Sequence, residues 1–294
     1  MKPIRAVPLL LATLFACRTA SLPLRMPEGY VVTPNGLMHG SCIRVLESGE
    51  SISRDGVVIH RSGERETLPP CRHPRLDPRT FSPLAADTGW VLSAGWTSPA
   101  PLGELRASFT VPSAPASSAA TFYFFPAITP GPTSGPIMQT DLGWHPDSAQ
   151  WMVSPAFCCP QGWRAKIRHV NVSPGDSLQG SITRCAPEPA AEVVPPCTWR
   201  LVITDVTTGQ ASALLVSDTT TFQRAGGGTM EAYWPDACNQ FPASGSISFS
   251  RIVLKDQDGN VLQPQWSSHY WRAALQCGFN IAVAPATVTL TWTP

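Results

Sequence analysis

A glutamine and a glutamate in two strand-like segments are the residues of this sequence best suited to chemistry. Gln139 lies in the segment 135–144, and Glu231 lies in the segment 229–234. A carboxylate can take a proton from water, and a neutral amide can donate a hydrogen bond to an oxygen on which negative charge develops. If folding brings the two side chains to one water, the pair predicts hydrolysis in the acid range.

Other chemical motifs lack the context that their chemistry requires. Gly175–Leu178 reads Gly-Asp-Ser-Leu, the nucleophile block of one class of serine hydrolases, but the Asp-x-x-His block that must serve it is missing from the sequence. We therefore interpret Ser173–Asp176 as a tight turn before a strand at 177–183. No His-Glu-x-x-His, Cys-x-x-Cys, P-loop or dinucleotide fingerprint occurs in the sequence. We expect neither a metal nor a cofactor.

The N-terminus indicates export. Lys2 and Arg5 precede an apolar run from Val7 to Phe15, which is typical of a secretory signal and too short to span a bilayer. The following Leu-Phe-Ala-Cys ends at Cys17 and approximates the box in which a bacterial lipoprotein is lipidated. We expect a signal over 1–17 and a protein that is either freely secreted or a cell-envelope lipoprotein, with any membrane contact made through that anchor.

The remaining cysteines predict disulfides. Eight remain, an even set in a chain bound for an oxidising compartment. Sequence proximity favours Cys42 with Cys71 and Cys185 with Cys197, which leaves Cys238 for Cys277. Two alternatives stay open for the adjacent Cys158 and Cys159, which can form a bridge with each other or pair elsewhere.

Composition excludes some partners and favours a class of fold. Lys and Arg number 21 against 20 Asp and Glu, so the net charge of +1 gives no field that would collect nucleic acid. Only 14% of residues are charged, and the 31 prolines and 22 glycines suit many short strands joined by turns. We expect a monomer.

Alternation of apolar and polar residues predicts strands at intervals of about ten residues from Trp90 onward. The clearest segments are 105–111, 120–125, 163–168, 199–204, 246–254 and 286–292. In the third, we expect Trp163, Ala165 and Ile167 to face inward, and Arg164, Lys166 and Arg168 to form a solvated face. About a dozen such strands indicate an all-β domain, an antiparallel sandwich of two packed sheets.

A boundary between two regions is predicted near Pro83 to Asp87. Residues 18–85 hold few periodic segments, with 57–60 the clearest, and end in a basic, proline-rich stretch at 69–79. We expect a small cystine-containing prosegment or N-terminal module with a linker over 18–85, and the sandwich over 86–294. The basic stretch is either a solvated linker or a processing site.

Several segments resemble, in order, the landmarks of the glutamic peptidases, or eqolisins, over about residues 90 to 255. The likeness is closest to secreted, uncharacterised relatives of that fold. The segments that carry it are Trp96, 107–112, 122–125, 137–140, 172–178, 207–209 and 230–233, with 231–238 matching those relatives. The resemblance implies a concanavalin-like sandwich, an acid endopeptidase activity on a peptide or protein substrate, and catalytic roles for Gln139 and Glu231.

The sequence departs from the family at two positions. The family has an aspartate four residues after the glutamine, where Gly143 stands here, and Asp141 would point to the same face of a strand as Gln139. Phe125 replaces a substrate-contacting tryptophan. We assign Phe125, Asp141 and Trp144 to substrate binding, and Trp144 and Trp151 are platforms for a peptide or a sugar unless they lie in the core. The rival hypothesis is a non-catalytic sandwich that binds glycan or protein at the cell surface.

Overall fold

The fold is built almost entirely from β-strands. The computed structural model describes residues 26–81, 88–116, 120–131, 135–185, 198–271 and 275–294. Within these ranges the helical segments are short 3-10 turns, and none is long and apolar enough to cross a membrane. The signal, Cys17 and the boundary at 83–87 lie outside the described residues, so those three assignments stay predictions.

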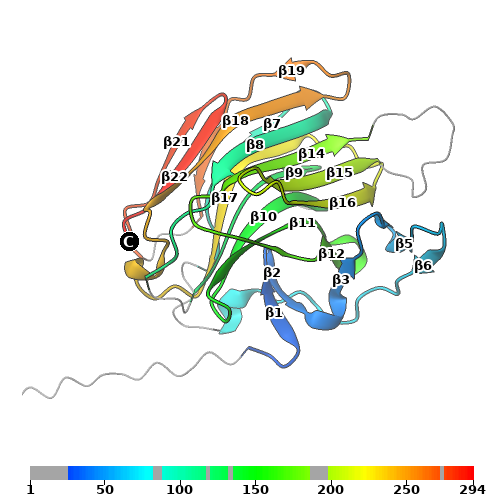
Figure 1. Ribbon diagram of the computed structural model, residues 1–294, viewed down its shortest axis with the longest axis horizontal. Helices are drawn as coiled ribbons and strands as arrows, with labels where there is room; N and C mark the ends of the chain where they lie inside the picture. Colours follow the sequence, from blue (N-terminus) through cyan, green and yellow to red (C-terminus); the bar gives the residue numbers. More distant parts are fainter. Residues whose placement is uncertain (1–25, 82–87, 117–119, 132–134, 186–197, 272–274) are drawn as a thin grey trace, which may run out of the picture.

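Two sheets pack face to face and form the predicted sandwich (Figure 1). The first, which we call the site sheet, runs in spatial order through β20 (Ser267–Tyr270), β7 (Gly89–Thr97), β17 (Arg224–Tyr233), β9 (Thr121–Thr129), β10 (Ile137–His145), β11 (Gln150–Cys158), β12 (Arg164–Ile167) and β3 (Ile43–Leu46), with β13 (Val170–Val172) beside β11.

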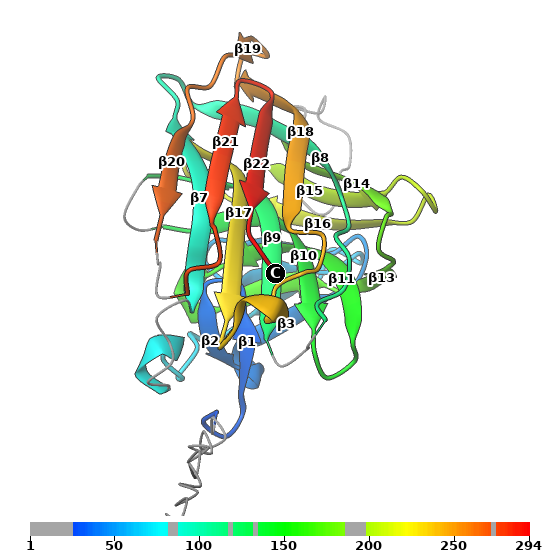
Figure 2. The same cartoon turned by 90° about the vertical axis from the view of Figure 1, so that its left-hand side faces the viewer.

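The second sheet, which we call the supporting sheet, closes the other side of the core. It runs through β21 (Asn280–Ala284), β22 (Thr287–Thr291), β18 (Ser246–Asp256), β8 (Leu102–Thr110), β14 (Ser177–Arg184), β15 (Trp199–Asp205), β16 (Ala211–Ser217), β4 (Ser51–Ser53), β5 (Val57–Ile59) and β6 (Arg65–Thr67), with β19 (Val261–Leu262) beside β18. Figure 2 shows β21, β22 and β18 side by side at one end of this sheet.

The alternating segments predicted from the sequence are all strands, namely β8, β9, β12, β15, β18 and β22. The turn predicted at Ser173–Asp176 is confirmed too, and it leads into β14. Inward-facing residues of both sheets, such as Phe124 of β9 and Phe249 of β18, form one buried core between them. Burial of this apolar surface is the main stabilising contribution to such a fold.

The N-terminal region adds strands to both sheets. β3 pairs with β12, and β4 pairs with β16, and both pairings are parallel. The other strand pairs of the described residues are antiparallel, as the predicted sandwich requires. Residues 43–67 contain too little periodic pattern to reveal their strands, because each strand is only three or four residues long. β3 and β4 pair with strands of the distant sandwich, and β5 and β6 extend the sheet from β4.

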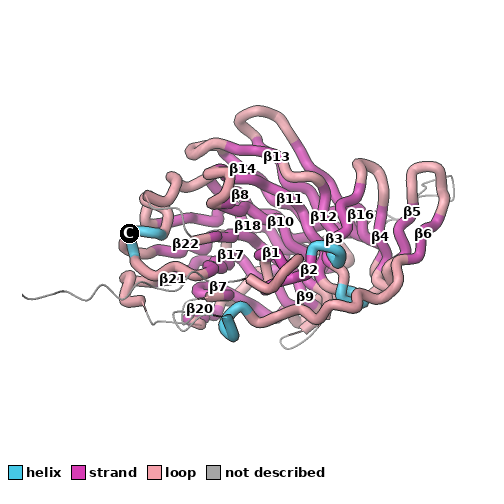
Figure 3. The backbone as a smooth tube through the Cα atoms, turned by 90° about the horizontal axis from the view of Figure 1, so that it is seen from below, coloured by secondary structure: helices cyan, strands magenta, loops and turns pink. Residues whose placement is uncertain are grey.

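A small hairpin precedes these strands and lies against the outer face of the site sheet. It consists of β1 (Tyr30–Thr33) and β2 (Gly36–His39), joined by Pro34 and Asn35. Asn35 has φ 76°, and a proline followed by a residue of positive φ is the pattern of a type II turn. Figures 1 and 3 show the hairpin beneath the strands of the site sheet, with β3 continuing beside β12.

One disulfide lies within the N-terminal region and another within the C-terminal region. The predicted pairs Cys42–Cys71 and Cys238–Cys277 are both confirmed. Cys158 and Cys159 are bonded to each other, which decides between the two alternatives. Cys185 is disulfide-bonded, and its predicted partner Cys197 lies outside the described residues.

Candidate functional site

Gln139 and Glu231 lie on the same face of the site sheet. Gln139 is on β10 and Glu231 on β17, and β9 runs between the two strands. Neighbouring residues on β10 alternate, so that Met138 and Leu142 enter the core while Gln139 faces the hairpin. Both Gln139 and Glu231 are 0% exposed. The hairpin accounts for this burial, because it covers the outer face of the sheet at this point.

One residue of the hairpin, Asn35, bonds to both side chains. Its backbone N–H donates to the two carboxylate oxygens of Glu231, at 3.1 and 2.8 Å. Its side-chain amide Nδ2 donates to Oε1 of Gln139 at 3.0 Å. The space between the Glu231 carboxylate and the Gln139 amide therefore holds the backbone amide and the side-chain amide of Asn35. An occupant with the size and polarity of a peptide group fits between them.

The Gln139 amide is fixed with its NH2 group unpaired. Arg164 NH1 also approaches Oε1 of Gln139, at 3.4 Å. Guanidinium groups can only donate, so this contact requires the amide oxygen, and not the nitrogen, on that side. Nε2 of Gln139 is buried and has no hydrogen-bond partner in the described part of the chain. A buried, unpaired donor is costly for the fold and available to an acceptor that enters the site.

Arg164 connects Gln139 to Asp141. Its NH2 atom lies 2.5 Å from Oδ2 of Asp141, and both side chains are nearly inaccessible to solvent. Burial raises the pKa of Asp141 to about 6, while the charge and hydrogen bond of Arg164 oppose that rise. Asp141 does share a face with Gln139, as the sequence predicted, but it acts on the glutamine through the guanidinium rather than directly.

The expectation of a solvated basic face on β12 is wrong for Arg164. Ala165 and Ile167 face the core as predicted, but Arg164 is only 3% exposed and pairs with Asp141. The alternation correctly predicted which side chains share a face of β12. The prediction that this second face is exposed to solvent was wrong at Arg164, because the hairpin region covers the outer face of the strand there. Period two separates two faces of a strand but does not say what covers the second face.

Two tyrosines complete the surroundings of Glu231. Tyr233 donates its hydroxyl hydrogen to Oε2 of Glu231 at 2.9 Å and accepts from the backbone N–H of Gly36 at 2.8 Å. Burial raises the pKa of Glu231 to about 8, against the lowering effect of the hydrogen bonds from Asn35 and Tyr233. Tyr123 lies opposite Glu231 on β9 and donates to the backbone oxygen of Val32 in the hairpin at 3.1 Å.

Tyr123 also explains why glycine stands at position 143. A Cβ atom on Gly143 would lie 2.8 Å from the Tyr123 ring, closer than any real contact. The ring therefore fills the place of the side chain that the resemblance to glutamic peptidases led us to expect there. The space beside Gly143 is thus filled by the ring of Tyr123 from the neighbouring strand, and the acidic side chain on this face of β10 is Asp141, two residues earlier.

The predicted substrate-contacting residues divide between the two faces of the site sheet. Phe125 lies on the outer face, in an apolar cluster with Tyr123 and Tyr233. Trp144 does not face the site: it is 4% exposed and belongs to the core between the sheets, where it packs on Trp151. Trp144 stands five residues after Gln139 on β10, and an odd spacing puts two strand residues on opposite faces.

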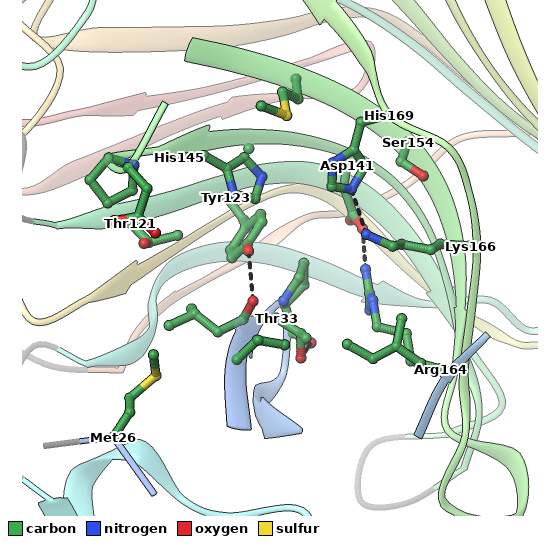
Figure 4. A pocket seen from close by; sticks show the side chains of 18 of the residues that line it. Met26, Thr33, Thr121, Tyr123, Asp141, His145, Ser154, Arg164, Lys166 and His169 are labelled. Atoms are coloured by element: carbon green, nitrogen blue, oxygen red, sulfur yellow. Dashed lines mark hydrogen bonds and ion pairs between the residues drawn. The ribbon is translucent and has the colours of Figure 1, made fainter. Parts of the chain in front are cut away.

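A cavity opens beside the site between the hairpin and β10–β12 (Figure 4). Its volume is about 460 Å³. Val31–Pro34 of the hairpin form one wall, and Asp141, Lys166 and His169 belong to the opposite one. The described residues contain no cluster of His, Cys, Asp and Glu that could hold a metal ion.

Sequence reasoning missed Asn35, Arg164 and the two tyrosines. A signal for the first was present, because Thr33-Pro-Asn-Gly36 is a strong turn pattern. That pattern predicts a turn, but nothing local indicates that the turn docks on residues about 100 and 200 positions later. Tyr233 lies two residues after Glu231, so their shared face was open to the same argument that identified Asp141.

Comparison with solved structures finds glutamic peptidases, the family that the sequence landmarks resemble. Scytalido-glutamic peptidase with a transition-state analog inhibitor is 17% identical, with a TM-score of 0.49 over 70% of this chain and 99% of that one. SCP-B, an eqolisin in complex with the tripeptide Ala-Ile-His, is 16% identical, with a TM-score of 0.44 over the same shares. Aspergilloglutamic peptidase from Aspergillus niger is 14% identical, with a TM-score of 0.36 over 59% of this chain and 99% of that one. No protein-family description and no curated protein sequence matches the chain.

Proposed function

We propose that this protein is an exported acid endopeptidase that its own N-terminal hairpin holds closed, with Glu231 as general base and Gln139 as oxyanion donor. The observation that carries the proposal is the bridging of both side chains by Asn35. A carboxylate and an unpaired amide donor face one space that already holds amide groups. In the open enzyme, a peptide bond of the substrate takes the place of Asn35.

The reaction then needs only these two side chains and water. The Glu231 carboxylate takes a proton from the water while the water oxygen attacks the carbonyl carbon of the peptide. The carbonyl oxygen becomes negatively charged, and Nε2 of Gln139 donates a hydrogen bond to it. Glu231 then returns the proton to the amide nitrogen as the carbon–nitrogen bond breaks, which releases an amine and a carboxylic acid.

The hairpin prevents this chemistry in two ways. Asn35 occupies both carboxylate oxygens of Glu231, so a substrate has to displace the turn. Burial also raises the pKa of Glu231 to about 8, and a carboxyl group that holds its proton through the acid range is no base. Displacement of the hairpin exposes Glu231 to water, which removes the main cause of the raised pKa.

The experiment that tests the proposal compares two substitutions of Asn35 in the full chain. Asn35→Pro removes the backbone N–H and is incompatible with the φ of 76°, because proline fixes φ near −65°. Asn35→Gly keeps both the N–H and the positive φ, and loses only the bond to Gln139. We expect Asn35→Pro to digest casein at pH 4 at least about ten times faster than the wild type, and Asn35→Gly to lie between them.

Two controls accompany that comparison. Circular dichroism and thermal melting establish that the Asn35→Pro protein keeps its sandwich, and Glu231→Gln in the Asn35→Pro chain should abolish the digestion. A folded Asn35→Pro protein that leaves casein intact across the acid range would contradict the proposal. That outcome would favour the non-catalytic binding sandwich, although the buried Trp144 offers such a protein no aromatic platform at this site.

A further inference from the structure

The cavity beside the site collects cationic and histidine side chains on one wall. Arg164 and Lys166 of β12 lie on the outer face of the site sheet, and His145 ends β10. His169 follows β12 and stacks at a tilt on His145, with ring centroids 5.3 Å apart. Figure 4 shows these side chains around the space that faces the hairpin. This wall stands apart from Glu231, and the proposed proton transfers do not use it.

Lys166 lacks an acidic partner. The carboxylate nearest in the sheet, Asp141, is already paired with Arg164 at 2.5 Å. No ion pair of Lys166 occurs among the described residues, and the side-chain contact of its Nζ is Nε2 of His169 at 2.9 Å. An ammonium group can only donate, so His169 must be neutral to accept this hydrogen bond.

The positive charge of this wall that has no paired carboxylate among the described residues is that of Lys166. Burial, followed by the charge of Arg164, lowers the pKa of Lys166 to about 8, against the raising effect of Asp141. Burial lowers the pKa of His169 to about 3, with Lys166 as the next cause. The same two causes lower the pKa of His145, against the raising effect of Asp147, which also lines the cavity. Each of the three groups is harder to charge chiefly because it is buried, and also because another cation is near. An anion bound in the cavity would raise the pKa of all three groups, because it attracts their charged forms.

The sheet places this wall at a definite distance from the proposed chemistry. Ala156 of β11 pairs with Gln139 on one side and with Lys166 on the other. Lys166 and Gln139 therefore stand in one row, two strands apart, which corresponds to about 10 Å between their backbones. An extended peptide covers that distance in about three residues. A group bound at Lys166 belongs to a residue near the bond that is cut.

We propose that this cavity is a subsite for a carboxylate of the substrate peptide, with Lys166 as its ion-pair partner. The proposal rests on the proposed function and gives it a substrate class, namely peptides with an acidic side chain or a chain terminus about two residues from the scissile bond. Lys166 donates to the carboxylate while His169 and His145 line the space beside it. Arg164 remains bonded to Asp141.

The first test measures binding and needs no catalysis. Three probes are titrated into the full-length protein at pH 6 and followed by NMR: acetyl-glutamate amide, acetyl-glutamine and acetyl-glutamine amide. The first carries a side-chain carboxylate, the second a terminal carboxylate and the third none, so the set separates the two sources. We expect at least one carboxylate probe to bind about ten times more tightly than acetyl-glutamine amide, as for a hydrogen bond to a charged group.

Matched variants assign the binding to Lys166. Lys166→Met should reduce the affinity for the carboxylate probe about tenfold, to that of the neutral probe, and Lys166→Arg should retain most of it. Lys255→Met is the control, because Lys255 pairs with Glu104 on the supporting sheet. Equal binding of all three probes, or unchanged binding in Lys166→Met, would overturn the subsite.

A second test separates the subsite from the peptidase. In the Asn35→Pro chain, peptides that differ only by glutamate or glutamine two residues from the cut should differ about tenfold in kcat/KM, and Lys166→Met should remove the difference. If carboxylate probes bind but no peptide is cut, the subsite stands and the peptidase falls. If peptides are cut with no preference and the probes bind equally, the peptidase stands and the subsite falls.

Discussion

At the scale of single residues, the site depends on donors that fix the glutamine. Gln139 presents its NH2 group because Asn35 and Arg164 both donate to its oxygen. Arg164 can hold that position because Asp141 holds the other arm of its guanidinium. The sequence predicted that Gln139 and Asp141 share a face, since their spacing is two. The sequence could not predict that Arg164 is buried and paired with Asp141, because the alternation of β12 is equally consistent with a solvated face.

Removal of Arg164 should therefore be costly. Arg164→Met leaves Asp141 buried without its cation, and the loss of one partner of a buried ion pair costs about 3–5 kcal/mol in free energy of unfolding. We expect urea denaturation to show that loss, and Asp141→Asn added to Arg164→Met to recover part of it. Equal stability of the Arg164→Met protein and the wild type would show that the pair contributes nothing to the fold.

The raised pKa of Glu231 predicts how stability depends on pH. The folded protein keeps the proton to about pH 8, whereas the unfolded chain releases it near 4.5. The contribution is thus fully present below about pH 4.5 and is lost as the pH rises toward 8. Burial of His169, which lowers its pKa to about 3, acts in the opposite direction, so we expect the Tm of the wild type to fall between pH 5 and pH 8 relative to that of Glu231→Gln. Asp141, whose pKa is also raised, to about 6, keeps the variant from becoming independent of pH. A Tm that falls as steeply in Glu231→Gln as in the wild type would rule out Glu231 as the source.

At the scale of elements, the hairpin is the part that turns a strand pair into a closed site. Its attachment combines the Asn35 contacts with the bonds of Gly36 to Tyr233 and of Tyr123 to Val32. Met38 of β2 packs into the same apolar cluster as Phe125. The strands of the sandwich were predictable because each carries its own alternation. The docking of the hairpin was not, because it depends on contacts between distant parts of the chain.

The Cys42–Cys71 disulfide should stabilise the closed arrangement. It joins the segment after β2 to residue 71, whose backbone N–H donates to the oxygen of Gln161 at 3.0 Å. Closure of a loop of 29 residues is worth about 3–4 kcal/mol in the chain-entropy account. We expect Cys42→Ser with Cys71→Ser to lower the unfolding free energy by about that amount and to speed hydrogen exchange of the Asn35 amide. Unchanged exchange at Asn35 would show that the hairpin stays docked without the bridge.

At the scale of the whole molecule, the sandwich was predictable and its completion was not. Period-two patterns predicted strands in both sheets, sequence proximity predicted Cys42–Cys71, and Cys238–Cys277 followed as the remaining pair. The parallel pairings of β3 with β12 and of β4 with β16 were not predicted, because strands this short carry little apolar–polar alternation. Trp144 was assigned to the site although its odd spacing from Gln139 places it in the core. The N-terminal region therefore does two things: its strands β3 and β4 pair with the two sheets, and its hairpin covers Glu231 and Gln139.

The most direct test of the central claim is the rate of peptide hydrolysis at pH 4 in the opened Asn35→Pro protein, with and without Glu231→Gln. Loss of a general base costs on the order of 10² to 10⁴ in rate, and loss of an oxyanion donor in Gln139→Ala costs on the order of 10² to 10³. We expect kcat to fall by those factors while KM changes little. An opened protein in which Glu231→Gln and Gln139→Ala cut the peptide as fast as their parent would contradict the account.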